Sequence, residues 1–279
     1  MKIGCSSWSF HRAFESEKMD LYNFISICAD ELKIDGVELL DFHINEEKYQ
    51  LKEVKNFIVR KGLTVSCVSA STNFGYRDEK KLSDEVSKVK HTIDLAVLLG
   101  SSIIRIFAGW EGPAPWDADY GKVRADRNEI WPRMMYCMKE SAIYAEEKGI
   151  FLAVENHNHR GIIHTKEDAE AILQEVNSPW CALTLDTEGY TDEEWYDVQH
   201  IDYKDFEQTV EYAVHIHFKV MHPGNDKIDD LIDYDRIFNI LQEYNYRGFV
   251  SLEYGGPEEE CTAIPRVIGF IKEKVLEQS

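Results

Sequence analysis

Four polar residues stand at the ends of four apolar, strand-like runs in the second half of the chain. They are Glu155 in "AVENH", Asp186 in "LTLDT", His217 in "HIHFK" and Glu253 in "SLEYGG". Successive members are 31, 31 and 36 residues apart, the length of one strand, loop, helix and loop. A buried strand rarely ends on a carboxylate that has no partner. We therefore expect these four side chains to act together at one site.

The residue types in this set favour a divalent cation. Three carboxylates that converge on a narrow space repel one another, and burial of even one unpaired acid shifts its pKa strongly. A divalent cation removes this difficulty because it supplies two positive charges at the centre. Three oxygen donors and one imidazole, without a thiolate, suit Mn²⁺, Mg²⁺, Co²⁺ or Zn²⁺. We predict that one such ion is bound by Glu155, Asp186, His217 and Glu253.

The same set predicts proton transfer next to a carbonyl group. A catalytic ion of this kind leaves coordination positions open for the substrate. It polarises a carbonyl and holds the adjacent hydroxyl, so that the C–H bond between them becomes acidic. Two carboxylates on opposite sides of that chelate can remove and return the proton. We predict that Glu155 and Glu253 form this acid–base pair.

Eight apolar, β-branched runs along the chain must position these residues. We predict strands at 2–8, 36–40, 64–70, 101–107, 150–156, 181–186, 213–220 and 249–254. The segments between them have one apolar face at helical spacing, as expected for helices that lie on a sheet. This spacing is clearest in two sets with the same offsets, namely Leu21, Phe24, Ile25, Cys28 and Leu32, and Ile264, Val267, Ile268, Ile271 and Val275. Thr165 precedes a further predicted helix as its N-cap, with Asp168 in the first turn.

The repeated strand–helix units predict one closed, parallel, eight-stranded (β/α)8 TIM barrel that forms a single domain over residues 1–279. An open doubly wound sheet is the alternative, but it normally carries a glycine-rich phosphate loop after the first strand. The sequence contains no GxGxxG or GxxxxGK[ST] motif. In a barrel the reactive groups lie where strands end and the following loops begin. The four polar residues are therefore expected on one rim.

Composition limits the partners of the chain. The formal net charge is −20, from 51 acidic and 31 basic residues, which disfavours binding to nucleic acid or to a lipid surface. Apolar runs all fall well short of the roughly 20 residues that span a bilayer. The chain starts on "MKIGCSSWSF", which does not have the pattern of a signal peptide, and its six cysteines form no CxxC pair. We expect a cytoplasmic protein with reduced thiols.

At the four strand ends the chain resembles the xylose isomerase-like TIM-barrel superfamily, specifically its sugar phosphate isomerase/epimerase group. The motifs "VENH", "LD", "HIHFK" and "SLEYGG", in that order and spacing, carry the resemblance, which extends over essentially the whole chain. It implies one catalytic divalent metal held by Glu155, Asp186, His217 and Glu253, with the two glutamates as acid and base. It also implies a small sugar or cyclitol substrate and barrels that pair as a homodimer or a higher homo-oligomer.

Two positions depart from the ketose 3-epimerases of this group. A substrate-contact histidine follows the aspartate ligand in those enzymes, whereas this chain has Glu188, and Lys219 and His222 stand where they carry an arginine. The pattern "HxK" is closer to the inosose dehydratase branch. A lyase that dehydrates an inosose or keto-sugar is therefore the first alternative, and a non-catalytic carbohydrate-binding barrel is the second. A nuclease of the superfamily is excluded, because "SAST" and "IFAGW" lack the histidines that it requires.

Two polar residues next to the predicted ligands are candidates for substrate contact. His157 lies two residues beyond Glu155 and therefore faces the same way on a strand, and it resembles the "E-x-H" histidine of the family. Lys219 is related in the same way to His217 and is expected to stabilise an enolate oxygen or to donate a proton. The alternative for Lys219 is a salt bridge to one of the many acids, and the alternative for His157 is a hydrogen bond within a loop.

Three tryptophans are further candidates for substrate contact. Trp110 and Trp116 belong to the stretch 108–127, which is long for such a connection and rich in Gly and Pro, as active-site lids often are. Trp8 ends the first predicted strand and faces the same rim. Each ring is expected either to stack on a sugar and exclude water or to pack against helices or a neighbouring subunit.

Overall fold

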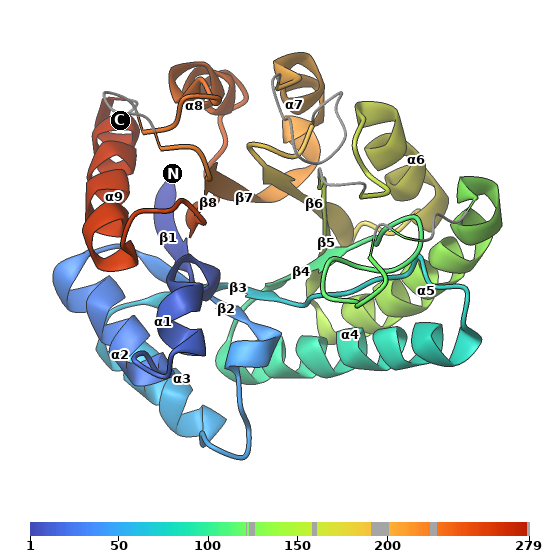
Figure 1. The fold of residues 1–279 in the computed structure, drawn as a ribbon, viewed down its shortest axis with the longest axis horizontal. Coiled ribbons are helices and arrows are strands. Elements are labelled where there is room, and N and C mark those ends of the chain that lie inside the picture. Colours follow the sequence, from blue (N-terminus) through green and yellow to red (C-terminus); the bar gives the residue numbers. More distant parts are fainter. Residues whose placement is uncertain (121, 123–125, 158–160, 191–200, 224–227, 278–279) are drawn as a thin grey trace.

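The computed structural model describes residues 1–120, 122, 126–157, 161–190, 201–223 and 228–277. Its eight strands are all parallel and close into a barrel in chain order, so the predicted (β/α)8 fold is confirmed (Figure 1). The strands are β1 (Lys2–Ser6), β2 (Gly36–Leu40), β3 (Thr64–Ser69), β4 (Ile103–Phe107), β5 (Phe151–Glu155), β6 (Cys181–Asp186), β7 (Ala213–Val220) and β8 (Phe249–Tyr254). Four predicted strands have the observed bounds, and the others differ by at most two residues at an end.

Helices surround the barrel (Figure 1). They are α1 (His11–Glu15), α2 (Leu21–Ser26), α3 (Leu51–Arg60), α4 (Glu79–Leu99), α5 (Arg127–Lys148), α6 (Lys166–Val176), α7 (Tyr203–Thr209), α8 (Tyr234–Glu243) and α9 (Glu260–Glu277). The two predicted apolar faces pack inward. In the first, Leu21, Phe24, Ile25 and Cys28 are fully buried, and in the second, Ile264, Val267, Ile268 and Ile271 are core residues of α9. No helix in the described part of the chain combines the length and the apolar character needed to cross a bilayer.

Local capping fixes the start of α6, the helix that follows β5. The Thr165 side chain accepts a hydrogen bond from the backbone N–H of Asp168, and the Asp168 side chain accepts one from the backbone of Thr165. This reciprocal capping box satisfies two backbone donors that have no partner within the helix. The predicted N-cap is confirmed.

Alternation along β7 divides its side chains between the barrel interior and the helix layer. Ile216, Phe218 and Val220 point outward, where the Phe218 ring stacks on Tyr234 of α8 at a centroid distance of 4.0 Å. Because neighbouring strand residues face opposite ways, His215, His217 and Lys219 point into the barrel. This strand therefore places three polar residues in a row along the barrel axis.

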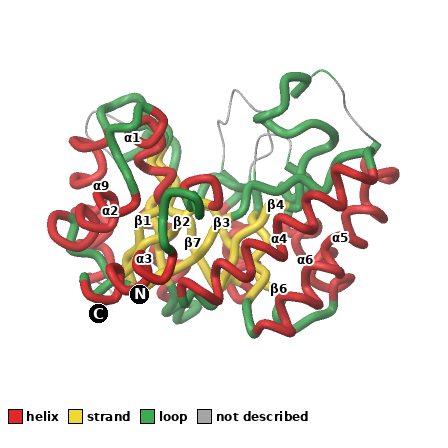
Figure 2. The backbone as a smooth tube through the Cα atoms, turned by 90° about the horizontal axis from the view of Figure 1, so that it is seen from below, coloured by secondary structure: helices red, strands yellow, loops and turns green. Residues whose placement is uncertain are grey.

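The strand register brings the predicted ligands to one rim. Asp186 pairs with His217 across β6 and β7, and Lys219 pairs with Glu253 across β7 and β8. Long loops gather at this end of the barrel, and the N-terminus lies at the opposite end (Figure 2). The fold thus directs one polar side chain from each of the last four strands toward the loop-covered rim.

Candidate metal centre

The structure brings the four predicted ligand residues together. Glu155, Asp186, His217 and Glu253 each offer a nitrogen or oxygen atom, and these four atoms lie within 4.8 Å of one another. Nδ1 of His217 is 3.3 Å from Oε1 of Glu155 and 3.5 Å from Oε1 of Glu253. The four residues are between 0% and 4% exposed, so this cluster is shielded from bulk water.

The donor atoms of this cluster fit one divalent cation. Within the described residues, the buried Nδ1 of His217 has no hydrogen-bond partner, although it faces two carboxylates. A buried polar atom without a partner is costly unless a ligand satisfies it. Glu155, Asp186 and Glu253 would supply three oxygen donors and His217 one nitrogen donor, and these atoms lie close enough together to surround one cation.

Hydrogen bonds from the neighbouring strand fix Asp186. The Asn156 side chain accepts a hydrogen bond from the backbone N–H of Asp186 at 2.7 Å and donates one to its carbonyl at 3.3 Å. Oδ1 of Asp186 accepts the backbone N–H of Glu188 at 2.8 Å. Gly189 permits this arrangement, since an added Cβ would lie 2.5 Å from the Asn156 carbonyl oxygen. Asn156 therefore has a structural role, in holding the backbone of Asp186.

Two buried cations contact the carboxylates. Nε of Arg105 on β4 lies 2.9 Å from Oε2 of Glu155. Nζ of Lys219 lies 2.8 Å from Oε2 of Glu253 and 3.7 Å from Oδ2 of Asp186. The predicted alternative for Lys219, an ion pair with an acid, is thus present, and its partners are two of the predicted ligands.

The buried groups around His217 carry an excess of negative charge that one divalent ion would neutralise. The buried carboxylates near this ring outnumber the buried cations by two, the groups being Glu38, Glu155, Asp186 and Glu253 against Arg105 and Lys219. An excess of two buried negative charges is unfavourable in a medium of low dielectric constant. One divalent cation beside a neutral His217 would remove that excess.

The pKa values reflect this excess of negative charge. Burial alone would lower the pKa of His217, but the carboxylates of Glu253, Glu38 and Glu155 outweigh it and raise the pKa well above its usual value. Burial raises the pKa of Asp186 well above its usual value, and the charges of Glu155 and Glu253 add to this. Each shift reduces the negative charge of the cluster, by protonating either an imidazole or an acid.

The charges of the cluster also shift the pKa values of Lys219 and Glu155, in directions that keep both groups charged. Burial would lower the pKa of Lys219, but Glu253, Asp186 and Glu155 raise it above its usual range. Burial would raise the pKa of Glu155, but the charges of His217 and Arg105 hold it well below its usual range. Lys219 is therefore an ammonium and Glu155 a carboxylate over the whole range in which the protein is expected to work.

Two of the predicted contact residues, Trp8 and His157, lie near residues of the cluster. Trp8 lies in the short 3-10 helix Ser7–Phe10 after β1, and Nζ of Lys219 lies 4.3 Å from its ring centroid. The His157 ring packs against Phe107 at 4.7 Å between centroids, and its positive form would lower the pKa of Glu155. Both side chains are partly exposed, as contact with a ligand requires.

The tryptophans of the predicted lid loop differ in exposure. Trp110 is buried, and its ring contacts Phe107, His157 and Trp116. Its backbone is held close to Gly75, where an added Cβ would lie 1.6 Å from the Trp110 carbonyl oxygen. Trp116 is 49% exposed. The Trp110 ring therefore packs against His157, whereas the Trp116 ring is open to solvent. Residues 121 and 123–125 of this loop lie outside the described part.

Glu188 occupies a buried position next to Asp186. Oε1 of Glu188 lies 3.5 Å from Nε2 of the exposed His222. Burial raises the pKa of Glu188, while the charges of Lys219 and His222 lower it. The two positions at which the chain departs from the ketose 3-epimerases are therefore in contact with each other.

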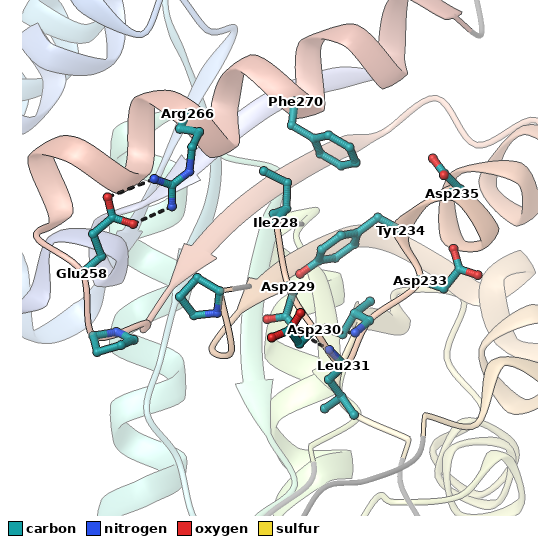
Figure 3. A pocket seen from close by; sticks show the side chains of 13 residues that line it. Ile228, Asp229, Asp230, Leu231, Asp233, Tyr234, Asp235, Glu258, Arg266 and Phe270 are labelled. Atoms are coloured by element: carbon teal, nitrogen blue, oxygen red, sulfur yellow. Dashed lines mark hydrogen bonds and ion pairs between the residues drawn. The ribbon is translucent and has the colours of Figure 1, made fainter. Parts of the chain in front are cut away.

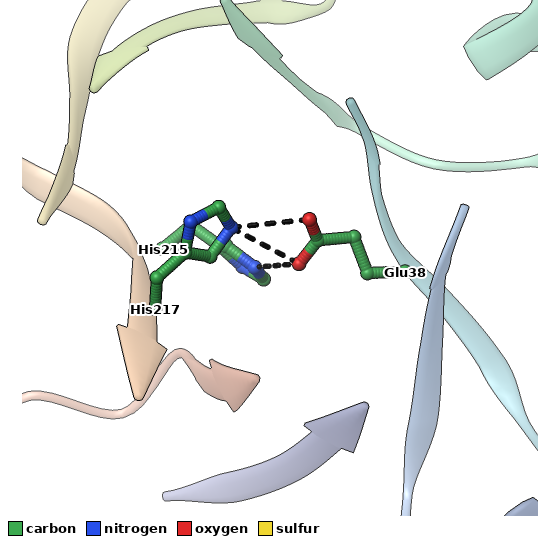
Figure 4. A group of neighbouring side chains, drawn as sticks. All are labelled: Glu38, His215 and His217. Atoms are coloured by element: carbon green, nitrogen blue, oxygen red, sulfur yellow. Dashed lines mark hydrogen bonds and ion pairs between the residues drawn. The ribbon is translucent and has the colours of Figure 1, made fainter. Parts of the chain in front are cut away.

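Three buried polar residues in strand interiors were not predicted from the sequence. They are Glu38 on β2, Arg105 on β4 and His215 on β7. The Glu38 carboxylate faces both His215 and His217 across the inside of the barrel (Figure 4). Burial would raise the pKa of Glu38, but the charges of both histidines hold it well below its usual range. A charged residue inside an apolar run, as in "GVELL" and "SIIRIF", is the signal that could have identified Glu38 and Arg105.

A large cavity lies apart from this cluster. It has a volume of about 1140 Å³ and lies between the segment 228–235 and α9 (Figure 3). Its walls include the Glu258–Arg266 ion pair, and Asp229 in its wall accepts backbone N–H groups of Met221, His222, Leu231 and Ile232. None of the four predicted ligand residues lines this cavity. The candidate metal site is therefore the buried cluster of Glu155, Asp186, His217 and Glu253, and this cavity is separate from it.

Solved structures with the same fold include sugar epimerases and a probable dehydratase. D-allulose 3-epimerase from Methylomonas sp., solved with D-allulose, is 18% identical with a TM-score of 0.74 and covers 98% of this chain and 97% of its own. The 3-keto-D-glucoside 4-epimerase of E. coli is 18% identical with a TM-score of 0.76 and coverages of 98% and 99%. A probable 3-DHS dehydratase from Bacillus anthracis is 17% identical with a TM-score of 0.75 and the same coverages.

Sequence comparison identifies the family. Among curated protein sequences, none matches the chain. A family model described as xylose isomerase-like TIM barrel matches residues 28–274, which is most of the sequence and includes all four predicted ligands. The chain therefore belongs to the xylose isomerase-like TIM barrel family.

Proposed function

We propose that this protein is a divalent-metal-dependent isomerase or epimerase of a ketose or a related polyhydroxy carbonyl compound. The observation that carries this proposal is the buried Nδ1 of His217, which faces carboxylates from β5 and β8 at 3.3 and 3.5 Å and has no hydrogen-bond partner within the described residues. The family and the sugar-epimerase structures of the same fold support the substrate class.

The proposed ion is held by one oxygen each of Glu155, Asp186 and Glu253 and by Nδ1 of His217. When bound, it would polarise the substrate carbonyl and stabilise the enolate left by proton removal. Mn²⁺, Mg²⁺, Co²⁺ and Zn²⁺ all accept this donor set. The chain's own residues then orient the substrate and move the proton.

Glu155 and Glu253 are proposed as the acid–base pair. They come from β5 and β8, on opposite sides of β6 and β7, so they can reach opposite faces of one substrate carbon. Each has one oxygen toward His217 and the other held by a cation, Arg105 for Glu155 and Lys219 for Glu253. This fixed orientation is what proton transfer to and from a carbon requires.

The remaining predicted residues are proposed to bind the substrate. Lys219 places an ammonium between the carboxylates and Trp8, where it can stabilise negative charge on a substrate oxygen. The Trp8 ring offers a flat apolar surface for a sugar, and His157 offers a hydrogen bond from the other side of the opening. We propose that Glu188 and Trp116 contact parts of the substrate that lie farther from the ion. The ring of Trp110 holds His157 in place.

Lys219 also supports a second candidate function, the dehydration of an inosose or keto-sugar. A dehydratase shares the enolate step and then needs a proton donor at the departing hydroxyl. Nζ of Lys219 lies 2.8 Å from Oε2 of Glu253, close enough for the same carboxylate to remove a proton while the ammonium protonates the leaving group. The dehydratase of the same fold is consistent with this alternative.

Solvent exchange in D₂O tests the proposal. The Mn²⁺-loaded protein is incubated with a panel of ketoses and inososes, and deuterium incorporation and products are followed by NMR and mass spectrometry. An isomerase or epimerase gives deuterated product, and a dehydratase gives loss of water. Exchange or turnover should disappear in Glu155→Gln and Glu253→Gln, whereas Glu85→Gln, a buried acid paired with Lys88 on α4, should retain it. Wild-type exchange in either of the first two variants would refute the assignment.

A further inference from the structure

Glu38 makes a dense set of contacts beneath the proposed metal site. Its carboxylate is fully buried and contacts three side chains, Ser69 of β3 and His215 and His217 of β7, of which the two histidines are drawn in Figure 4. Ser69 Oγ donates to Oε1 at 2.7 Å, and Nε2 of His215 lies 2.9 Å from Oε2. Nε2 of His217 lies 3.1 Å from Oε1 and 3.2 Å from Oε2. The carboxylate is thus held in place by two residues and in turn contacts His217.

The contact with Glu38 determines which nitrogen of His217 carries the proton. A neutral imidazole has one N–H group and one nitrogen with a free lone pair. Both oxygens of Glu38 face Nε2 of His217, and Glu38 also accepts a hydrogen bond from Ser69, so we assign the N–H group of the ring to Nε2. When an ion is bound and the ring is neutral, Nδ1 is then the nitrogen with the lone pair, and it faces Glu155 and Glu253. Rotation of the ring would break the contact with both oxygens of Glu38.

We propose that Glu38 is a positioning residue that holds His217 in the tautomer and orientation required for metal binding through Nδ1. A carboxylate that accepts the second N–H of a metal-bound histidine raises the basicity of that ligand and fixes its ring. Ser69 and His215 keep Glu38 in place for this role. The inference rests on the proposed metal site, because it assigns Glu38 a role only toward that ion.

The variant Glu38→Gln tests this role, because it keeps the shape of the side chain and removes its charge. Mn²⁺ affinity is measured by isothermal titration calorimetry and by the EPR signal of free Mn²⁺, so no turnover is needed. We expect binding to weaken by about 10- to 100-fold, as for other outer-shell carboxylates. Glu85→Gln removes a buried charge outside the barrel and should leave the affinity unchanged.

A spectroscopic measurement on the wild-type protein needs no variant and remains decisive if Glu38→Gln does not fold. Nitrogen-15 NMR of the Zn²⁺-loaded protein should show His217 with its proton on Nε2 and with Nδ1 bound to the ion. A proton on Nδ1, or Mn²⁺ affinity in a folded Glu38→Gln protein equal to that of wild type, would overturn the role of Glu38. If the wild-type protein itself binds no divalent ion, the proposed function fails instead, so the two failures are distinguishable.

Discussion

Replacement of Lys219 by methionine should affect the metal-free protein far more than the metal-bound one. Lys219→Met keeps most of the length of the side chain and removes the ammonium that lies 2.8 Å from Glu253. At that distance and an effective dielectric constant of about 20, two unit charges attract by about 6 kcal/mol. Loss of one partner of a buried ion pair costs about 3–5 kcal/mol after desolvation is included. In a chain of this size this lowers the Tm of the metal-free protein by about 10 °C.

The ion should restore much of this loss, because it supplies positive charge to the same carboxylates. By linkage, Lys219→Met should then bind Mn²⁺ at least about tenfold more tightly than wild type, although it loses turnover. Calorimetric unfolding of both proteins after chelation and in excess Mn²⁺ measures the effect, and titration with Mn²⁺ measures the affinity. Lys88→Met breaks an ion pair on α4 and should lose the same stability with and without Mn²⁺. An equal loss in both states for Lys219→Met would refute the idea that ammonium and ion share the carboxylates.

Two further predictions concern metal removal and pH. Chelation should lower the free energy of unfolding by about 3 kcal/mol relative to protein at 100 times the Kd of Mn²⁺, measured by calorimetry; an unchanged Tm would contradict the site. Burial, with a smaller effect of His11, lowers the pKa of His43 to about 4, so the folded state binds fewer protons than the unfolded state. Stability should therefore fall by up to about 3 kcal/mol as the pH drops from about 6.5 to 4. The His43 ring should titrate near pH 4 by NMR, and a midpoint near 6.5 would contradict this.

The sequence identified the rim of the barrel because strand ends are defined by local patterns. Asp186 and Glu253 end apolar runs that are bounded by turn residues, and their spacing of one strand–helix unit per ligand follows from the fold. The strand order then brings them together without any further information. Alternation along the strand likewise directs Asn156, the neighbour of Glu155, away from the interior.

Contacts across the barrel were not predictable in this way. Glu38 and His215 are 177 positions apart in the chain and meet only because the barrel closes with a particular stagger between β2 and β7. Arg105 reaches Glu155 from the neighbouring strand, a pairing that depends on side-chain direction rather than on spacing. The burial of Trp110 was not predictable from the sequence either, since it depends on the close approach to Gly75 in another loop.

A crystal grown with Mn²⁺ and measured at a wavelength that reveals anomalous scattering from manganese tests the central claim most directly. We predict one strong peak per chain, bonded to one oxygen each of Glu155, Asp186 and Glu253 and to Nδ1 of His217, at distances of about 2.1–2.3 Å. The absence of a peak among these four side chains, or a peak bonded to Nε2 of His217 on the side of Glu38, would contradict the account.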